Sequence, residues 1–550
     1  MSTNPIERAS NAYDYPLLIK QLLHTPLATA PDQEIVYRDL ARHSYREMRD
    51  RLGQLASGLS KLGVKPGDTV AVMDWDSHRY LECFFAVPMM GAVLMTVNVR
   101  LNPEQILYTL NHAGPKVLLV NAEFLPIVEG LKDRLETIET FVLISDAPYA
   151  AQAAIPLECE YEILLLSGSS NYDFPDFDEN TRATTFYTTG TTGLPKGVYF
   201  SHRQLVLHTL AETAALGMAN IQGRVHRDDV YMPITPMFHV HAWGMPYTAT
   251  MMGLKQVYPG RYSPDGLLEL KVREGVTFSH CVPTILQMLL ASPKIDSCDL
   301  TGWKIIIGGS ALPTGVAEAA LQRGIDVFTG YGMSETCPIL TLAQVKTSLL
   351  KGEDDKAVAL RVKTGLPIPL VDLRIVDHDM KDAVHDGKAT GEIVVRAPWL
   401  TQGYYKNPEA SEALWAGGYL HTNDIGCIDS NGYLQVTDRL KDVIKTGGEW
   451  VSSLEIEDII SQHPAVAEVA VIGVKDDKWG ERPKALVVLK AGQTANLTAD
   501  DLKAFIKTFA DRGIISKFGI PQDIAFIDAL IKTSVGKLNK KALREAYQND

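Results

Sequence analysis

The residues best suited to chemistry stand together in the stretch YTTGTTGLPKG, which runs from Tyr187 to Gly197. Its four threonines, three glycines and one lysine disfavour both helix and strand. Threonine hydroxyls and glycine backbone N–H groups can wrap a phosphate chain, and a lysine can neutralise its charge. The stretch taken alone is therefore either a phosphate-binding loop or an ordinary surface turn.

The spacing in this stretch differs from that of a Walker A loop. Gly190 and Lys196 have the separation of that motif, but Pro195 replaces its second glycine. Gly197 replaces the serine or threonine that would bind magnesium. The loop is therefore predicted to bind phosphate without belonging to a P-loop NTPase.

Three further motifs follow in order along the chain: GYGMSET at 330–336, DRLKDVIKTGGEW at 438–450 and SVGKLNKKALR at 534–544. With the first stretch, they closely resemble the adenylate-forming superfamily and, within it, the acyl-CoA synthetases. The resemblance covers nearly the whole chain. It implies a reaction in two steps: a carboxylate attacks the α-phosphate of ATP and releases pyrophosphate, and the thiol of coenzyme A then displaces AMP. An anion that approaches a polyanion needs cations and oriented donors at one point.

The resemblance implies a nucleotide and coenzyme A site assembled from several segments. The residues that match positions contacting ATP or coenzyme A are Thr188, Thr189, Gly190, Thr191, Thr192, Lys196, Gly309, Ser310, Ala311, Thr329, Gly330, Tyr331, Gly332, Asp424, Arg439, Lys441, Lys445, Trp450, Gly447 and Gly448. Asp424 matches the carboxylate that binds ribose, although Asn423 stands where the family usually has glycine. Gly447 and Gly448 match the loop that lines the pantetheine tunnel.

Four side chains are expected to act on the reacting atoms: Lys537, Glu335, Ser334 and His239. Glu335 and Thr191 match the family's magnesium-binding positions, and hard cations prefer such oxygen ligands. Lys537 matches the lysine that stabilises the adenylation transition state. Without the resemblance, Glu335 would be taken as a surface charge. Lys537 would then be one more lysine of a basic stretch that also holds Lys532, Lys540 and Lys541.

The acid is expected to bind beside the segment PMFHVHAWGMPY at 236–247. The residues expected to shape this pocket are His239, Val240, Trp243, Gly308, Gly330 and Met333. His239 is either a wall of the pocket or a core residue, and Trp243 either a gate or a structural tryptophan. We expect a neutral, mostly apolar short- to medium-chain tail, since each buried methylene contributes about 0.8 kcal/mol. Branched, alicyclic, aromatic and thioether acids, 3-methylmercaptopropionate among them, fit the same description.

Three other activities share parts of this machinery. A luciferase-type enzyme would oxidise the adenylate, and a standalone adenylating enzyme would load a carrier protein. Amino-acid-loading members carry an acidic partner near the A-W-G segment, which this sequence lacks. An inactive nucleotide-binding regulator would have lost Lys537 or Glu335, and both are present.

The surrounding pattern predicts an α/β protein in two parts. Strand-like and helical segments alternate from about residue 35 to 330, which favours layered α/β subdomains. Short strands from about 364 to 438 predict a small β-rich subdomain, and the tail predicts a small, mobile α+β domain. We therefore expect an adenylation domain at 1–438 and a C-terminal domain at 439–550, with a hinge near Lys441.

Composition limits the class of protein further. The formal net charge of −13 argues against general nucleic-acid binding. The six cysteines are scattered, which favours a reduced, cytoplasmic location. The apolar run at 83–97 is too short for a membrane helix and predicts a buried helix ending near Gly91, then a buried strand. The expected partners are a carboxylic acid, ATP with Mg²⁺ and coenzyme A, without stable membrane insertion, and a homodimer is the family's frequent habit.

Overall fold

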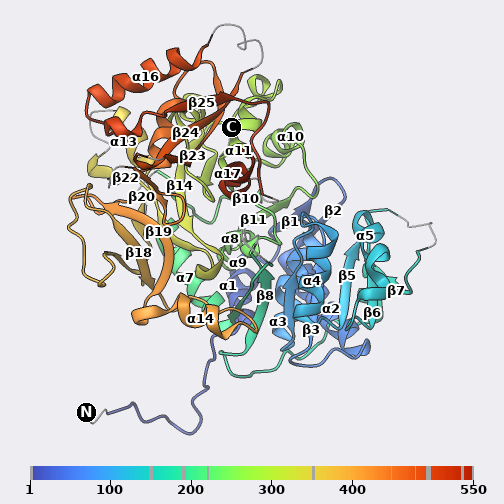
Figure 1. Ribbon diagram of the computed structural model, residues 1–550. Helices are drawn as coiled ribbons and strands as arrows, with labels where there is room; N and C mark the ends of the chain where they lie inside the picture. Colours follow the sequence, from blue (N-terminus) through green and yellow to red (C-terminus); the bar gives the residue numbers. More distant parts are fainter. Residues whose placement is uncertain are drawn as a thin grey trace.

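Two large sheets form the body of the protein (Figure 1). The computed structural model describes residues 4–147, 153–188, 194–219, 222–349, 354–446, 449–476, 478–490, 497–533 and 538–547. The seven-stranded sheet has the order β7 (Leu157–Glu160), β6 (Thr140–Ile144), β5 (Val117–Asn121), β3 (Thr69–Met73), β4 (Val93–Thr96), β8 (Arg182–Tyr187) and β9 (Gly197–Ser201). Its pairs are parallel except β8 with β9.

The second sheet has nine strands. Their order is β16 (Leu366–Pro367), β15 (Ile339–Leu342), β14 (Asp326–Gly332), β13 (Lys304–Ile307), β12 (Phe278–Cys281), β10 (Val230–Pro233), β11 (Lys255–Tyr258), β1 (Glu34–Tyr37) and β2 (Ala41–Ser44). The inner strands from β14 to β1 are parallel. Strands such as β5 and β13 are buried along their whole length, which explains their continuous Val, Leu and Ile runs.

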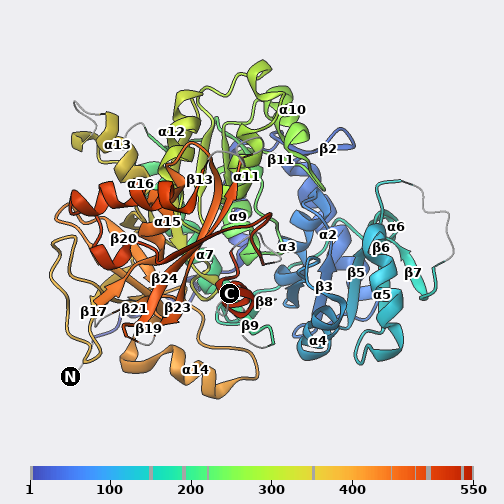
Figure 2. The ribbon, with the colours of Figure 1, turned by 45° about the horizontal axis from the view of Figure 1, so that its top comes forward.

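Helices cover these sheets, as Figure 2 shows for α2, α3 and α4 beside β3. The helices are α1 (His24–Thr29), α2 (Tyr45–Lys61), α3 (His78–Met89), α4 (Pro103–Ala113), α5 (Leu125–Leu131), α6 (Tyr161–Ser167), α7 (His202–Met218), α8 (Val240–Trp243), α9 (Met245–Met252), α10 (Pro264–Glu274), α11 (Pro283–Leu290), α12 (Thr314–Gln322), α13 (Asp354–Arg361), α14 (Pro408–Leu414), α15 (Ser453–Ser461), α16 (Ala499–Asp511) and α17 (Lys540–Tyr547). The apolar run at 83–97 forms the end of α3 and then β4, as expected. No described helix is both long and apolar enough to cross a bilayer.

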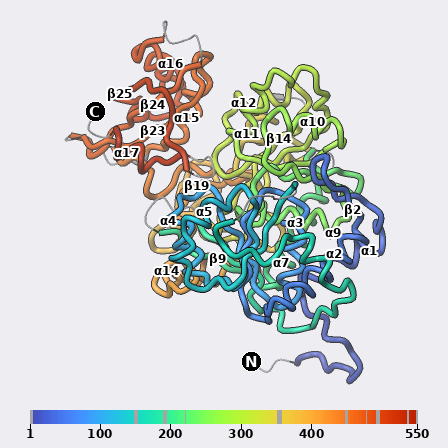
Figure 3. Tube along the Cα trace, turned by 90° about the vertical axis from the view of Figure 1, so that its right-hand side faces the viewer, coloured from blue at the N-terminus to red at the C-terminus, as the bar shows by residue number. Residues whose placement is uncertain are grey.

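Two smaller sheets follow. An antiparallel sheet consists of β17 (Asp372–Val376), β18 (Gly391–Arg396), β19 (Leu420–Ile428) and β20 (Leu434–Arg439). The last consists of β22 (Glu449–Val451), β21 (Ile444–Thr446), β24 (Gly480–Leu489) and β23 (Val466–Asp476), with β25 (Asp523–Phe526) beside β24. Figure 3 shows this last sheet, with α15 and α16, standing beside the body.

One strand is longer than the sequence pattern indicates. The glycines of GYGMSET favour a turn, but β14 continues through Gly332 and pairs antiparallel with β15. A Cβ at Gly332 would lie 1.8 Å from the Pro338 carbonyl oxygen, and one at Gly330 would lie 2.9 Å from the Ile306 side chain. These glycines therefore serve close strand packing rather than a turn.

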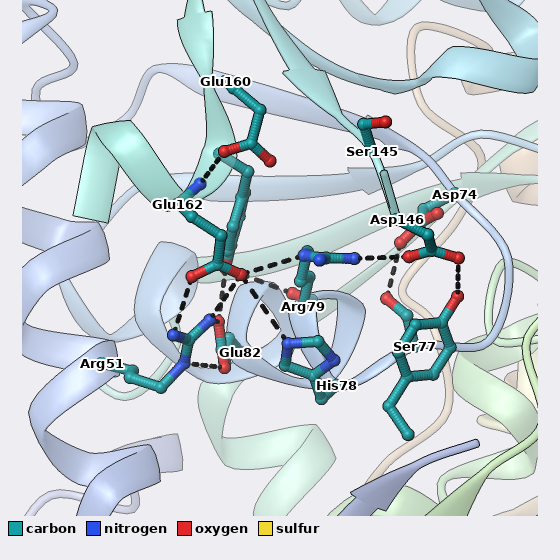
Figure 4. Close-up of polar contacts among 12 residues, drawn as sticks. Arg51, Asp74, Ser77, His78, Arg79, Glu82, Ser145, Asp146, Glu160 and Glu162 are labelled. Carbon is teal, nitrogen blue, oxygen red and sulfur yellow. Dashed lines mark hydrogen bonds and ion pairs between the residues drawn. The ribbon is translucent and has the colours of Figure 1, made fainter. Parts of the chain in front are cut away.

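An ion network ties the helices α2, α3 and α6 to the end of β6 (Figure 4). Arg51 contacts Glu82 at 2.6 Å and Glu162 at 2.8 Å. Arg79 contacts Glu162 at 3.0 Å and Asp146 at 2.9 Å. The Glu82 side chain is only 3% exposed, so its charge depends on these partners.

Candidate active site

A buried carboxylate lies at the end of the GYGMSET segment. Glu335 belongs to a short 3₁₀ turn directly after β14, and its backbone carbonyl accepts from the Thr401 N–H at 2.9 Å. The Tyr404 hydroxyl donates to Glu335 Oε1 at 2.6 Å. Burial raises the pKa of Glu335, and the Tyr404 hydrogen bond and the Lys196 charge oppose that rise.

Lys196 contacts the same tyrosine from the other large sheet. Its ammonium lies 4.4 Å from the centre of the Tyr404 ring, a cation–π distance. The Thr188 N–H donates to the Lys196 carbonyl at 2.9 Å, so β8 and β9 close the base of the threonine-rich loop. Tyr404 thus contacts both Lys196 and Glu335, which are far apart in sequence. Thr189, Gly190, Thr191 and Thr192 lie outside the described residues.

A second carboxylate lies nearby on β19. The Tyr331 hydroxyl donates to Asp424 Oδ2 at 2.7 Å, and Arg439 Nε lies 3.6 Å from Asp424 Oδ1. Asn423 has a φ of 58°, the left-handed region that suits glycine and, next to it, asparagine. Asparagine can therefore replace the family's usual glycine there without changing the turn.

Other predicted nucleotide contacts lie along the ends of β13 and β14. Gly309 has a φ of 82° in the turn after β13, while Ser310 and Ala311 are exposed. The Thr329 hydroxyl donates to the Lys363 carbonyl, so it is already engaged within the protein. Ser334 begins the 3₁₀ turn and is partly exposed.

A cavity connects this region with the predicted acid pocket. It is lined by Arg100, Ile234, Thr235, Pro236, His239, Trp243, Tyr262, Val282, Thr284, Ile285 and Gly309. His239 and Trp243 therefore face the same space as the turn after β13. A Cβ at Gly308 would lie 2.8 Å from the Gly330 carbonyl oxygen and 2.9 Å from the Trp243 indole, so the glycine lets the ring lie against the strand ends. Met333 and Val240 pack into the surrounding apolar core.

The backbone that carries Trp243 is left-handed. Val240, His241, Ala242 and Trp243 have φ values of 48°, 55°, 48° and 61°, and Gly244 follows at 79°. Such a conformation costs about 1–2 kcal/mol for each residue other than glycine. The strain falls at the segment that closes the cavity, as is common at ligand sites.

Buried polar side chains lie behind this turn. His208, Glu212 and His241 are almost fully buried among aromatic rings. Burial lowers the pKa of His241 to about 3 and raises that of Glu212 to about 8, so both are mostly neutral at neutral pH. The sequence motifs did not identify these three buried residues as part of the site, nor did they identify Tyr404 and Arg100.

The C-terminal residues of the predicted site are described in part. Lys441 lies two residues after the end of β20, and burial lowers the pKa of its ammonium group. Lys445 and Trp450 are paired residues of the β21–β22 hairpin. Gly447, Gly448 and Lys537 lie outside the described residues.

Comparison with known proteins shows the family of the chain. Residues 23–405 match the family described as AMP-binding enzyme, and residues 455–537 match its C-terminal domain. The chain is 40% identical to a long-chain-fatty-acid–CoA ligase of Thermus thermophilus, over 98% of this chain and 97% of that one. It is 36% identical to a 3-methylmercaptopropionyl-CoA ligase of Ruegeria lacuscaerulensis, over 97% of this chain and 98% of that one. The crystal structure of an anthranilate CoA ligase with anthranoyl-AMP has a TM-score of 0.84 and 24% identity, covering 98% of each chain, which shows the shared fold.

The fold and the family matches thus define an adenylate-forming enzyme. The chain belongs to the AMP-binding enzyme family, and within that family it is an AMP-forming acyl-CoA ligase. The predictions of fold class and of reaction type are confirmed.

Proposed function

We propose that this ligase activates a short- to medium-chain monocarboxylic acid. An oxygen of the acid attacks the α-phosphorus of ATP, and pyrophosphate leaves. The sulfur of coenzyme A then attacks the acyl carbon, the thiol loses its proton, and AMP leaves. The observation that carries the proposal is that Tyr404 contacts both Glu335 and Lys196, with Asp424 close enough to act on the pKa of Glu335. His239, Trp243 and Gly309 line one cavity.

The roles of the nucleotide-binding residues form part of this proposal. The threonine-rich loop and Lys196 hold the β- and γ-phosphates, and Ser334 donates to the α-phosphate. Asp424 accepts from the ribose hydroxyls with Arg439 beside it, and the ends of β13 and β14 form the wall against adenine. Since Asp424 already accepts from Tyr331, its carboxylate is held in place before a nucleotide arrives.

The surroundings of Glu335 fit a divalent cation. Burial raises the pKa of this carboxyl group, so a positive ion beside it would stabilise its charged form. Carboxylate, hydroxyl and phosphate oxygens suit Mg²⁺. We propose Glu335 and Thr191 as the protein residues nearest to Mg²⁺, which would offset the charge of the phosphates when bound.

The proposed acid pocket is small and mostly apolar. Ile234, Val282 and Ile285 lie with Trp243 around the cavity, while Arg100 and Tyr262 also line it. A compact thioether acid fits this space as well as an alkyl acid does, because sulfur is apolar and polarizable. One relative is named for long-chain fatty acids, beyond the proposed range, and another for 3-methylmercaptopropionate, a compact thioether acid. 3-Methylmercaptopropionate is therefore the second candidate substrate.

The division of labour along the chain is proposed as well. Residues 1–438 bind ATP and the acid, and residues 439–550 bring Lys537 for adenylation and Gly447 with Gly448 for thioester formation. Lys441 is the proposed hinge between the two arrangements. We also propose a cytoplasmic homodimer.

Exchange of labelled pyrophosphate into ATP tests the proposed function. The panel runs from acetate to palmitate and adds benzoate, branched acids and 3-methylmercaptopropionate. We expect acid-dependent exchange with a maximum at short or medium tails, and AMP with acyl-CoA as products when coenzyme A is added. Absence of exchange with every acid would contradict the proposal. Light emission, or transfer to a carrier protein without coenzyme A, would favour the other family activities.

A further inference from the structure

The described residues on both sides of Lys537 are held in place. Lys532 and Leu538 form an antiparallel bridge, and the Asn539 N–H donates to the Ile531 carbonyl at 2.9 Å. The residues before and after Lys537 are therefore brought together. What Lys537 can reach depends on what anchors these two flanks.

The flank before Lys537 is anchored on β23. The Lys532 ammonium lies 2.7 Å from Glu468 Oε2. This pair fixes the residues before Lys537 to the sheet of the C-terminal part.

The flank after Lys537 is anchored more deeply, through Lys540 at the start of α17. The Lys540 ammonium lies 2.7 Å from Glu457 Oε1 and donates to Ser453 Oγ at 2.5 Å. The side chains of Lys540 and Glu457 are only 9% and 12% exposed. A buried, hydrogen-bonded pair of this kind holds its partners in one geometry, unlike an exposed pair.

The same contacts continue to the nucleotide side of the site. Ser453 donates to Asp438 Oδ2 through its N–H at 2.7 Å and through its hydroxyl at 2.6 Å. Asp438 lies on β20 directly before Arg439, which faces Asp424. An unbroken chain of polar contacts therefore runs from Lys540 to the strand beside the proposed ribose site.

We propose that Lys540 is a positioning residue for adenylation, which holds the Lys537 loop in register with β20 through Glu457, Ser453 and Asp438. This inference rests on the proposed function. Lys540 does not touch the reacting atoms; it fixes where Lys537 can reach. Because a displacement of about 1 Å can cost on the order of a hundredfold in rate, loss of this anchor should be visible in the half-reaction that uses Lys537.

The test compares the two half-reactions in the full-length enzyme. Lys540→Met should lower the single-turnover rate of acyl-AMP formation by about ten- to a hundredfold. Formation of acyl-CoA from supplied acyl-AMP should stay within about threefold of wild type, since Lys537 is not needed there. Lys540→Arg should recover most of the adenylation rate, because arginine can also reach a carboxylate and a hydroxyl.

Lys541→Met is the matched control. Lys541 is the next residue, its side chain is 44% exposed, and its pair with Glu545 at 3.7 Å joins exposed positions of one helix. We expect both half-reactions of this variant to match wild type. Lys540→Met leaves the buried Glu457 carboxylate without its partner, which can prevent folding. The double variant Lys540→Met/Glu457→Gln removes that charge as well, so the test can be made with it if Lys540→Met alone fails to fold.

A double-mutant cycle with Lys537→Ala decides whether Lys540 acts through Lys537. If it does, adding Lys540→Met to the Lys537→Ala enzyme should slow acyl-AMP formation little further, because the effects of coupled residues are not additive. Three results would overturn the inference. The folded Lys540→Met enzyme could form acyl-AMP at the wild-type rate, or its two half-reactions could slow by the same factor. Lys540→Met could also slow acyl-AMP formation as much in the Lys537→Ala enzyme as in wild type. A wild-type enzyme without pyrophosphate exchange would instead contradict the proposed function itself.

Discussion

At the scale of single residues, the site depends on charges held where water is scarce. Glu335 is buried, and its hydrogen bond from Tyr404 keeps its carboxylate more acidic than burial alone would allow. Lys196 stacks on the same tyrosine ring. Tyr404 therefore contacts both candidate charges, although no sequence motif singled it out.

Tyr404→Phe should move the acidic limb of adenylation activity to higher pH. The Tyr404 hydrogen bond lowers the pKa of Glu335, so its removal raises that pKa and protonates Glu335 at a higher pH. We expect about a tenfold loss of pyrophosphate exchange on the acidic side, a higher requirement for Mg²⁺, and convergence with wild type at alkaline pH. Tyr405→Phe, at the neighbouring tyrosine that packs against Arg182, should leave the profile unchanged. A uniform loss at every pH would contradict this role.

At the scale of elements, turns and helix contacts decide where the candidate residues lie. β14 runs through the glycines of GYGMSET, so Tyr331 lies within a strand and reaches Asp424 on β19. The bulge of β19 and β20 between Ile425 and Gly426 follows directly after that carboxylate. The adjacent Asn423 adopts the left-handed conformation.

Asn423→Gly should keep the turn, and Asn423→Ala should weaken it. Asn423 is exposed, so little packing is lost in either variant. We expect Asn423→Ala to lower the free energy of unfolding by about 1 kcal/mol, while Asn423→Gly stays within about 0.5 kcal/mol of wild type. Denaturant unfolding measures both, and the KM for ATP reports whether Asp424 has moved. Equal effects of alanine and glycine would show that backbone conformation is not what matters there.

Arg51→Met should destabilise the packing of α2 against α3 and α6. It leaves Glu82, which is only 3% exposed, with an uncompensated charge, and such losses cost about 3–5 kcal/mol. Thermal unfolding should show the loss, and the double variant Arg51→Met/Glu82→Gln should recover part of it. Arg46→Met, on the same helix, removes an exposed pair with Asp32 and should cost at most about 0.5 kcal/mol. Similar losses for the two arginines would contradict the buried network.

At the scale of the whole molecule, the proposed mechanism needs two arrangements of the C-terminal part at one active site. One brings Lys537 for adenylation, and the other brings Gly447 and Gly448 for thioester formation. That part is built on its own five-stranded sheet and its own apolar core. It contacts the body where Thr314 on α12 donates to Asp458 on α15, and where Ser453 donates to Asp438. Polar contacts of this kind suit a joint that forms in the adenylation arrangement and opens in the proposed alternation.

Lys537→Ala should separate the two half-reactions. A positioned cation contributes strongly to a transition state that gains charge, so we expect acyl-AMP formation to fall by about 10²–10³. Acyl-CoA formation from supplied acyl-AMP should be nearly unchanged. Rapid-quench measurement of each step checks this, and an equal fall in both would argue against alternating use of the C-terminal part.

Local sequence was sufficient to determine the elements and the reaction type. The buried helix and strand of the run at 83–97 and the short strands after residue 364 are set by local patterns, and they were predicted correctly. The order of four motifs was enough to identify the family, because each motif carries its chemistry within a few residues.

Only the tertiary structure decided which of these residues meet. Glu335 and Tyr404, Asp424 and Tyr331, and Lys540 and Glu457 are each brought together from distant segments by sheet pairing and helix docking. The left-handed turn before Gly244 also depends on its packing, since no local preference favours four such residues in a row. Sequence alone therefore determined what chemistry this protein can do, and the packed fold decided which side chains are close enough to do it.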